Sequence, residues 1–299
     1  ALLGVIAPDD VPDGDIEAFV SSYVAPTAGE SGEEEGGPKY EHAEVPAGRL
    51  RYAKKGEGAE KVILIHGFGG DLDNWLFNID ALAESSTVYA LDLPGHGESV
   101  KKMADASLTG MAKTVLAFMD KVGIDAAHLV GHSLGGAIAM QVAQDAPARV
   151  KSLSLVAPAG LGSEINGNYI TGFVSSTSRR DLKPAVEQLF VNQELVSRQL
   201  IDNLLRYKRI DGVEAALKSL SAAVFPGGKQ ANVLAAAAAK SGKRTLVIWG
   251  KEDRILPVAH AKALGDAAKV EVIENAGHMV QMEASPAVNA LLKEHIAKG

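Results

Sequence analysis

The sequence predicts an α/β domain with a mostly parallel sheet, helices on both faces of the sheet, and a helical cap. From Tyr40 onward, short apolar segments that suit buried strands alternate with segments that have the pattern of helices. Such alternation favours a parallel sheet covered by helices. One long helical segment, residues 161–243, interrupts the alternation, and we assign it to the cap. The core is then predicted at residues 40–160 and 244–299.

The predicted elements follow from this pattern in chain order. The core elements are a hairpin at 41–45 and 49–53, strands at 62–65, 88–91, 126–130, 150–156, 245–249 and 270–273, and helices at 72–83, 108–122, 134–144, 258–264 and 284–297. The cap contributes helices at 184–190, 195–209 and 213–225 and an alanine run at 235–239. An insertion at this place is predicted to cover the carboxyl edge of the sheet, where ligands bind in open α/β folds.

Composition and charge exclude several classes of function. The chain has no cysteine, so it has neither disulfides nor a thiolate metal site, and no apolar run approaches the length of a membrane span. We therefore expect no metal, no membrane association and a cytoplasmic location. The net charge is −7, and residues 1–39 alone hold nine acids and one base. No basic face suited to nucleic acid is predicted outside residues 161–243, which hold eleven bases and seven acids.

A GxSxG sequence joins the strand 126–130 to the helix 134–144, with Ser133 at its centre. A serine at such a turn has a strained backbone and an exposed hydroxyl, and glycines at 131 and 135 remove side chains that would clash. The amide of Leu134 then points toward a developing oxyanion. The motif is weak evidence alone, because glycine-rich packing beside an idle serine gives the same letters.

A serine nucleophile needs a base, and position along the chain selects His278. It follows the last predicted strand on a glycine-containing loop, at the edge where Ser133 also emerges. Six other histidines are predicted to be solvated or structural, and two of them, near glycine turns, are able to shape the pocket. The first group is His42, His128, His260 and His295, and the second is His96 and His132.

The acid that orients the base is predicted at Asp253, which follows the strand 245–249. Glu252 is adjacent and stays open as an alternative. Asp92 ends an earlier strand, but the following Pro-Gly turn favours a structural role. The second oxyanion donor is predicted in the loop 66–70, His-Gly-Phe-Gly-Gly, at the amide of Phe68.

These motifs together resemble the α/β-hydrolase fold. The matching segments are residues 66–70, Asp-Leu-Pro-Gly-His-Gly-Glu-Ser at 92–99, Gly-His-Ser-Leu-Gly-Gly at 131–136, Trp-Gly-Lys-Glu-Asp at 249–253 and Ala-Gly-His at 276–278. The resemblance implies Ser133 as nucleophile, Asp253 as acid and His278 as base. It also implies Phe68 and Leu134 as oxyanion amides, and it leaves the reaction open.

The amino end narrows the choice of reaction. Residues 1–24 are similar to the last strand and tail helix of a lipoyl domain, and residues 25–39 have the composition of a flexible acidic linker. This arrangement resembles the dihydrolipoyllysine-residue acetyltransferase subunit of bacterial acetoin dehydrogenase complexes. The resemblance implies acetyl transfer from acetyl-dihydrolipoamide to CoA, with the other subunits of the complex as partners. It also implies lipoate on an upstream lysine that this sequence lacks.

The sequence lacks two features of related acyltransferases, and two other functions stay open as alternatives to acetyl transfer. The His-x-x-x-Asp-Gly motif and the peripheral-subunit-binding segment of other 2-oxo acid dehydrogenase acyltransferases are missing, so the serine triad must supply the chemistry. CoA accepts the acetyl group from an acyl-serine or directly. The alternatives are hydrolysis of a small ester, thioester or carbon-carbon bond with water as acceptor, and a non-catalytic binding module.

A cationic cluster in the predicted cap is a candidate for binding the CoA phosphates. Its members are Arg206, Lys208 and Arg209, with Arg198 nearby. The competing reading is a solvated helix face, because runs of charge usually have that role. Acyl chain length, oligomeric state and cap mobility are not determined by the sequence.

Overall fold

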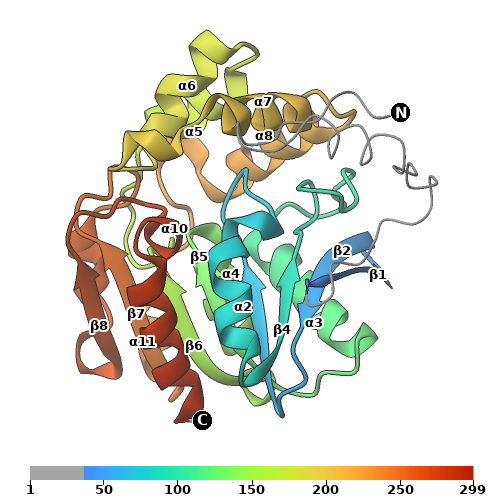
Figure 1. The fold of residues 1–299 in the computed structure, drawn as a ribbon, viewed down its shortest axis with the longest axis vertical. Helices are drawn as coiled ribbons and strands as arrows, with labels where there is room; N and C mark the ends of the chain where they lie inside the picture. The colour runs from blue at the N-terminus through green and yellow to red at the C-terminus, as the bar shows by residue number, and fades with distance from the viewer. Residues whose placement is uncertain (1–36, 299) are drawn as a thin grey trace, which may run out of the picture. The chain divides into compact units, whose positions relative to one another are not determined.

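A computed structural model of the 299-residue chain describes residues 37–298. The predictions for residues 1–24, and for all but the last three residues of the linker 25–39, lie outside the described residues. The unit that begins at Pro38 contains the sheet, the helices on its two faces and the cap (Figure 1). Of the described helices, none has both the length and the apolar character needed to cross a bilayer.

One eight-stranded sheet forms the centre of the molecule, in the order β1-β2-β4-β3-β5-β6-β7-β8. The hairpin β1–β2 is antiparallel, β2 pairs antiparallel with β4, and the remaining pairs are parallel. The strands are β1 (Lys39–Val45), β2 (Gly48–Lys55), β3 (Glu60–Ile65), β4 (Ser86–Leu91), β5 (Ala127–His132), β6 (Val150–Val156), β7 (Arg244–Gly250) and β8 (Ala268–Ile273). The mostly parallel sheet predicted from the sequence is confirmed.

The central strands contain runs of buried apolar residues because each of their faces is covered. In β3, Ile63 and Ile65 belong to one hydrophobic cluster, whereas Val62 and Leu64 belong to the other. All four are fully buried. Successive side chains of a strand point to opposite faces, so a strand that is buried on both sides shows no polar alternation.

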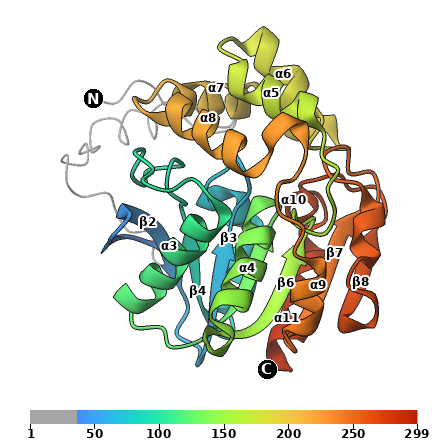
Figure 2. The same ribbon diagram turned by 180° about the vertical axis from the view of Figure 1, so that it is seen from behind.

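Helices cover both faces of the sheet (Figures 1 and 2). On one face lie α2 (Leu76–Ala83), α10 (Val280–Glu283) and α11 (Ser285–Ala297), and on the other lie α3 (Leu108–Lys121), α4 (Leu134–Asp145) and α9 (Ala235–Lys240). The alanine run of the predicted cap therefore forms a helix, α9, that packs against α4 beside the sheet. Short 3-10 helices η1 (Leu72–Trp75), η2 (Pro147–Arg149), η3 (Gln193–Leu195), η4 (Pro226–Gly228), η5 (Val258–Lys262) and η6 (Gly265–Ala267) lie between these elements.

Four helices form a cap over one end of the sheet, as Figure 1 shows at the top. They are α5 (Gly167–Ser175), α6 (Arg179–Glu187), α7 (Arg198–Lys208) and α8 (Val213–Val224). The cap shares one hydrophobic cluster with the sheet, and the ring of Phe68 lies 6.1 Å from that of Phe173 and 5.9 Å from that of Phe225. The hydroxyl of Tyr207 donates to the carbonyl of Gly95 (2.8 Å) and fixes α7 to the loop after β4.

Several predicted helix boundaries were wrong, each for a local reason. The predicted helix 184–190 begins earlier, at Arg179, because Ser178 accepts a hydrogen bond from the third amide of α6 and caps it. The predicted helix 195–209 begins at Arg198, where Ser197 has the same capping role. The helix predicted at 258–264 is a 3-10 helix, and α5 was not predicted.

Candidate active site

Ser133 lies at the sharp turn between β5 and α4, with φ 53° and ψ −118°. This left-handed conformation is unusual for a residue with a side chain and persists only where surrounding structure enforces it. The amide of Ser133 donates to the carbonyl of Val156 (3.0 Å), and its own carbonyl accepts from the amide of Ala159 (2.9 Å). These two bonds tie the turn to the end of β6 and hold the strained backbone.

The glycines around Ser133 are required by close backbone contacts. A Cβ at Gly131 would lie 2.3 Å from the carbonyl oxygen of Gly135, and a Cβ at Gly135 would lie 2.1 Å from that of Ile65. Real Cβ atoms essentially never approach other atoms this closely. The clash predicted from the motif is therefore present, and the turn packs directly against the end of β3.

His278 and Asp253 meet at the carboxyl edge of the sheet. The Nδ1 atom of His278 donates to Oδ2 of Asp253 (2.8 Å), and the two side chains are 4% and 0% exposed. The same oxygen accepts from Nε1 of Trp249 (3.0 Å), and Oδ1 accepts from the amides of Ile255 (2.7 Å) and Leu256 (3.0 Å). The carboxylate is thus fixed by four donors, and it fixes the imidazole with Nε2 as the free nitrogen.

Glu252, the alternative acid, has a different contact. Its Oε2 atom accepts from the amide of Ala276 (3.2 Å), and its own amide donates to the carbonyl of the same residue (3.1 Å). Glu252 therefore supports the loop that carries His278, whereas Asp253 contacts the imidazole itself.

Ser133 and His278 line the same cavity under the cap. Within residues 37–298 no hydrogen bond joins the Ser133 hydroxyl to the imidazole of His278. Catalytic hydrogen bonds are often long in structures without substrate and shorten when substrate is bound. The structure thus brings three distant segments to one place, at the end of β5, after β7 and after β8.

Phe68 and Leu134, whose amides are predicted to bind the oxyanion, lie in the segments next to Ser133. Phe68 lines the cavity with Ser133, and Leu134 is the first residue of α4. Neither amide donates a hydrogen bond to any described residue. Leu134 lines a different small hollow and follows Ser133 directly in the chain.

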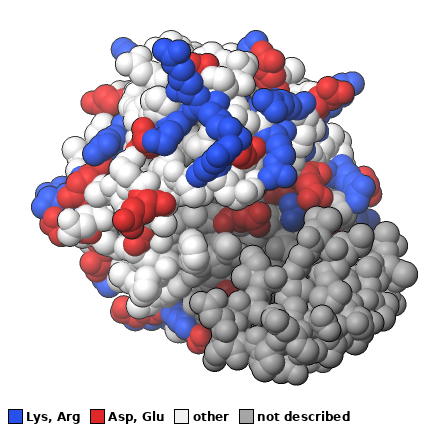
Figure 3. Space-filling view, turned by 45° about the horizontal axis from the view of Figure 1, so that its top comes forward, with Lys and Arg blue, Asp and Glu red and all other residues white. Residues whose placement is uncertain are grey.

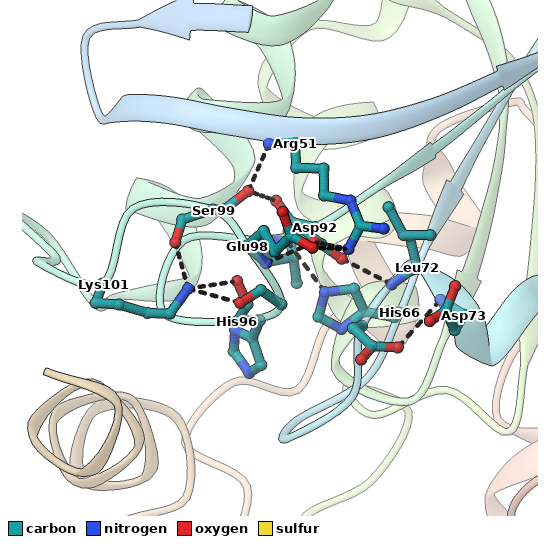
Figure 4. A network of polar contacts seen from close by, with 12 residues as sticks. Arg51, His66, Leu72, Asp73, Asp92, His96, Glu98, Ser99 and Lys101 are labelled. Atoms are coloured by element: carbon teal, nitrogen blue, oxygen red, sulfur yellow. Dashed lines mark hydrogen bonds and ion pairs between the residues drawn. The ribbon is translucent and has the colours of Figure 1, made fainter. Parts of the chain in front are cut away.

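Two buried histidines, which Figure 4 draws, connect the loop that carries Phe68 to the loop after β4. Nε2 of His66 accepts from the amide of Leu93 (3.0 Å), and Nε2 of His96 accepts from the amide of Gly69 (3.1 Å). Burial lowers the pKa of His66 to about 4, and burial together with the neighbouring His66 lowers the pKa of His96 to about 3. Both rings are therefore neutral near pH 7 and act as acceptors, a structural role that the sequence suggested only for His96.

Asp92 connects the same loop to the hairpin, as Figure 4 shows. Its carboxylate is fully buried and accepts from the amides of Leu72 (2.8 Å) and Glu98 (2.9 Å). Arg51 lies 3.7 Å from it. Within the described residues, no hydrogen bond joins Asp92 to His278. The contacts of Asp92 fit the structural role predicted for it.

His132 contacts the backbone of His278 directly. Its Nε2 atom donates to the carbonyl of His278 (2.9 Å), and the two rings lie 4.7 Å apart. Burial, with the nearby ring of His278, lowers the pKa of His132 well below its usual value. His132 is thus a neutral donor that positions the loop of His278.

The cavity is lined mainly by apolar side chains from the cap and by polar groups from the core. The polar side of the lining includes Asn74, His132, Ser133 and His278. The apolar side includes Phe68, Ile165, Tyr169, Ile170, Phe173, Val186, Leu189, Phe190, Leu200, Leu204, Phe225, Ile255, Met279 and Met282. A cavity with such a lining is suited to an apolar ligand.

The other histidines lie elsewhere. His42 is exposed on β1, His128 contacts Ser152 (2.7 Å) and Glu60 (2.8 Å), and His260 contacts Glu164 (2.7 Å). His295 is buried on α11. Residues 37–298 contain no group of three or more His, Cys, Asp or Glu side chains arranged to hold a metal ion.

The chain matches a sequence family and several curated proteins. The family described as alpha/beta hydrolase fold matches residues 61–285. The chain is 54% identical over 296 residues to the dihydrolipoyllysine-residue acetyltransferase component of the acetoin cleaving system of Cupriavidus necator, covering 99% of this chain and 79% of that protein. It is 45% identical over 301 residues to the component of the same name from Pseudomonas putida, covering 99% and 80%.

Among solved structures, the fold is similar to a variant of the meta-cleavage product hydrolase CumD. The TM-score is 0.80 at 25% sequence identity, and the match covers 87% of this chain and 98% of that one. The resemblance therefore extends over the sheet and the cap together.

Proposed function

The chain belongs to the α/β-hydrolase fold family, and from that premise we propose that it is an acyltransferase of acetoin catabolism. In this proposal it transfers an acetyl group from acetyl-dihydrolipoamide to CoA. The observation that carries the proposal is the 54% identity, over 99% of this chain, to an acetyltransferase component of an acetoin cleaving system. Many reactions share this fold, so the fold alone does not support the choice. The support comes from the acetyltransferase relatives and from the site.

The site supports Ser133 as nucleophile, His278 as base and Asp253 as the orienting acid. When a neutral imidazole donates from Nδ1, as His278 can to Asp253 (2.8 Å), its lone pair is on Nε2, which then accepts a proton from an alcohol. Because four donors hold the carboxylate of Asp253, it remains oriented while the imidazole becomes charged.

The proposed reaction has two steps. The Ser133 oxygen forms a bond to the thioester carbon, its proton passes to His278 Nε2, the carbon-sulfur bond breaks, and the departing sulfur takes that proton. The CoA thiol then gives its proton to His278 and attacks the acyl-serine carbon, the carbon-oxygen bond breaks, and Ser133 recovers its proton. One thioester is consumed and one is formed, so no oxidant or further reactant is needed.

Phe68 and Leu134 are proposed to stabilise the oxyanion of each tetrahedral intermediate through their amides. Neither amide has an acceptor in the described residues, and the strained turn at Ser133 and the bond from Gly69 to His96 hold their loops. Loss of one such donor typically costs about 3 kcal/mol of transition-state stabilisation.

The donor substrate is proposed to enter the apolar cavity. An acyl-dihydrolipoyl arm is a mostly hydrocarbon chain, and side chains such as Phe173, Leu200 and Leu204 offer a matching surface beside Ser133. We further propose residues 1–24 as part of a lipoyl-type domain, 25–39 as a linker and 161–243 as the cap. The lipoate itself is carried by an upstream lysine, the partners are other subunits of an acetoin dehydrogenase complex, and the location is cytoplasmic.

Incubation with acetyl-dihydrolipoamide and CoA tests the proposal. We expect acetyl-CoA as the main product and a loss on the order of a millionfold in turnover for Ser133→Ala. An unaffected rate in that variant would contradict the mechanism. Free acetate as the main product in the presence of CoA would instead indicate hydrolysis, the activity in the names of several structural relatives. If Ser133 does not react with a serine-directed phosphonate, the domain is a binding module.

A further inference from the structure

Positively charged side chains gather on the cap. Figure 3, which looks onto it, shows Lys and Arg side chains over the upper surface. A hollow in this region is lined by four arginines, Arg179, Arg180, Arg206 and Arg209, and by one carboxylate, Asp202. Four positive charges against one negative charge leave the hollow with a formal charge of +3, whereas the whole chain has −7.

Lys208 does not belong to this hollow, although the sequence grouped it with its neighbours. Its Nζ atom donates to the carbonyls of Phe173 and Val174 (3.1 Å to the latter), and it lies 4.9 Å from the centre of the Phe173 ring. The lysine is therefore engaged at the end of α5. Arg198 also lies outside the lining and is 3.9 Å from Asp202.

The arginines of the hollow differ in how far they are engaged. Arg179 forms a two-bond contact with Asp202, with Nη2 at 2.8 Å from Oδ2, and Arg206 donates to Asn203. Arg180 and Arg209 are exposed and take part in none of the ion pairs of residues 37–298. Two guanidinium groups from different helices thus face solvent beside two that are already oriented.

Guanidinium groups in this arrangement are suited to phosphate. The planar fork of arginine binds phosphate oxygens through two parallel hydrogen bonds, and its weak hydration lowers the cost of the contact. Because one carboxylate neutralises only one of the four guanidinium groups, the net positive charge of the hollow suits a ligand with several phosphates. The ligand class that fits is a nucleotide with more than one phosphate group.

Helix α7 separates this hollow from the cavity of Ser133. Leu200 and Leu204 line the cavity, whereas Arg206 and Arg209 line the hollow. A helix with its side chains is about 10–12 Å across, so the two sites are about one helix diameter apart. In CoA about thirteen bonds separate the thiol from the nearest phosphate, a span of ~15 Å at extended-chain lengths. The extended thiol arm is therefore longer than α7 is thick.

We propose that the hollow lined by Arg179, Arg180, Arg206 and Arg209 binds the phosphates of CoA and directs its thiol across α7 to Ser133. The proposal rests on the acyl transfer proposed above. The acidic residues 1–39 of this chain are the competing occupant, with nine acids and one base. Two features favour CoA: the forked geometry of the cations and the position of the hollow one helix away from the serine.

The variant Arg206→Gln/Arg209→Gln tests the site in the full chain. Calorimetric titration with CoA and with adenosine 3′,5′-bisphosphate measures the phosphate contacts without catalysis, and we expect both dissociation constants to rise at least tenfold. In acetyl transfer, the preference for CoA over pantetheine, which lacks the nucleotide phosphates, is expected to fall at least tenfold. Arg180→Gln, on α6, provides an independent variant with an expected rise of at least threefold in the CoA dissociation constant.

The matched control is Arg198→Gln/Lys218→Gln, which removes the same charge from the cap outside the hollow. We expect less than a twofold change in CoA binding. An equal loss in the control, or unchanged CoA binding in Arg206→Gln/Arg209→Gln, would overturn the proposal. Unchanged binding with faster proteolysis within residues 25–39 would assign the hollow to the acidic segment. If acetyl-CoA never forms, the proposed reaction fails, whereas the calorimetric result still decides whether the hollow binds CoA.

Discussion

Acidification will destabilise the protein through His66 and His96. The pKa of a histidine in the unfolded chain is about 6.5, and burial lowers it to about 4 for His66 and about 3 for His96. Because the unfolded chain binds these protons more readily, stability is present above pH 6.5 and is lost as the pH falls toward the folded values. Between about pH 7.5 and pH 5, linkage gives a loss of ~2 kcal/mol of unfolding free energy for each histidine.

The two losses have a direct structural cause. Protonation would place an N–H of His66 against the amide of Leu93, and one of His96 against the amide of Gly69, where each ring now accepts a hydrogen bond. Both contacts hold the loop of Phe68. In the folded protein both rings stay neutral at pH 5, so these contacts persist there, and the loss of stability down to pH 5 comes from protonation of the unfolded chain.

Urea unfolding at the two pH values measures the effect. The quantity to compare is the drop in unfolding free energy from pH 7.5 to pH 5, which should be smaller by ~2 kcal/mol in His66→Gln and by ~4 kcal/mol in His66→Gln/His96→Gln than in the parent. Other groups titrate in both proteins and cancel, including Asp71, whose pKa burial raises to about 7. His42→Gln, at an exposed site, is the control. An identical drop in parent and His66→Gln would refute the reasoning.

Three further substitutions test other contacts. Trp249→Phe removes one donor to Asp253 and should slow acetyl transfer about tenfold, equivalent to ~1.4 kcal/mol; an unchanged rate would mean that the other donors suffice. Gly135→Ala places a Cβ 2.1 Å from a carbonyl at the end of β3 and should lower the unfolding free energy by ~1–3 kcal/mol in urea, whereas Gly172→Ala, with its nearest contact at 3.8 Å, should not. Lys208→Met should cost ~1–3 kcal/mol by the same measurement yet change the CoA Michaelis constant less than twofold, and a larger kinetic change would place this lysine in the CoA site.

The parts of the fold that the sequence predicted are those with a local signature. The turn at Ser133 is encoded by Gly131 and Gly135, since neither position has room for a Cβ, and both glycines stand beside the serine in the sequence. The central strands were also predicted, because a strand that is buried on both faces contains an apolar run such as residues 62–65 of β3.

The parts that the sequence did not predict depend on contacts between distant residues. Helix α5 has glycine at two of its nine positions, and it is stabilised by packing of Tyr169, Ile170 and Phe173 in the cap. The choice between Glu252 and Asp253 depends on which carboxylate reaches His278, 25 residues away. The separation of Lys208 from the arginines depends on carbonyls 34 and 35 residues away. Composition and spacing carry none of this information.

Helix α7 presents leucines to the cavity of Ser133 and arginines to the hollow on the cap, so one rigid body contributes to two sites. A ligand that rotates this helix on one side necessarily changes the shape offered on the other. If both sites are used in a single turnover, the donor and the acceptor will not bind independently, and each will alter the affinity of the other by the same factor. The strength of this coupling would then depend on a single helix.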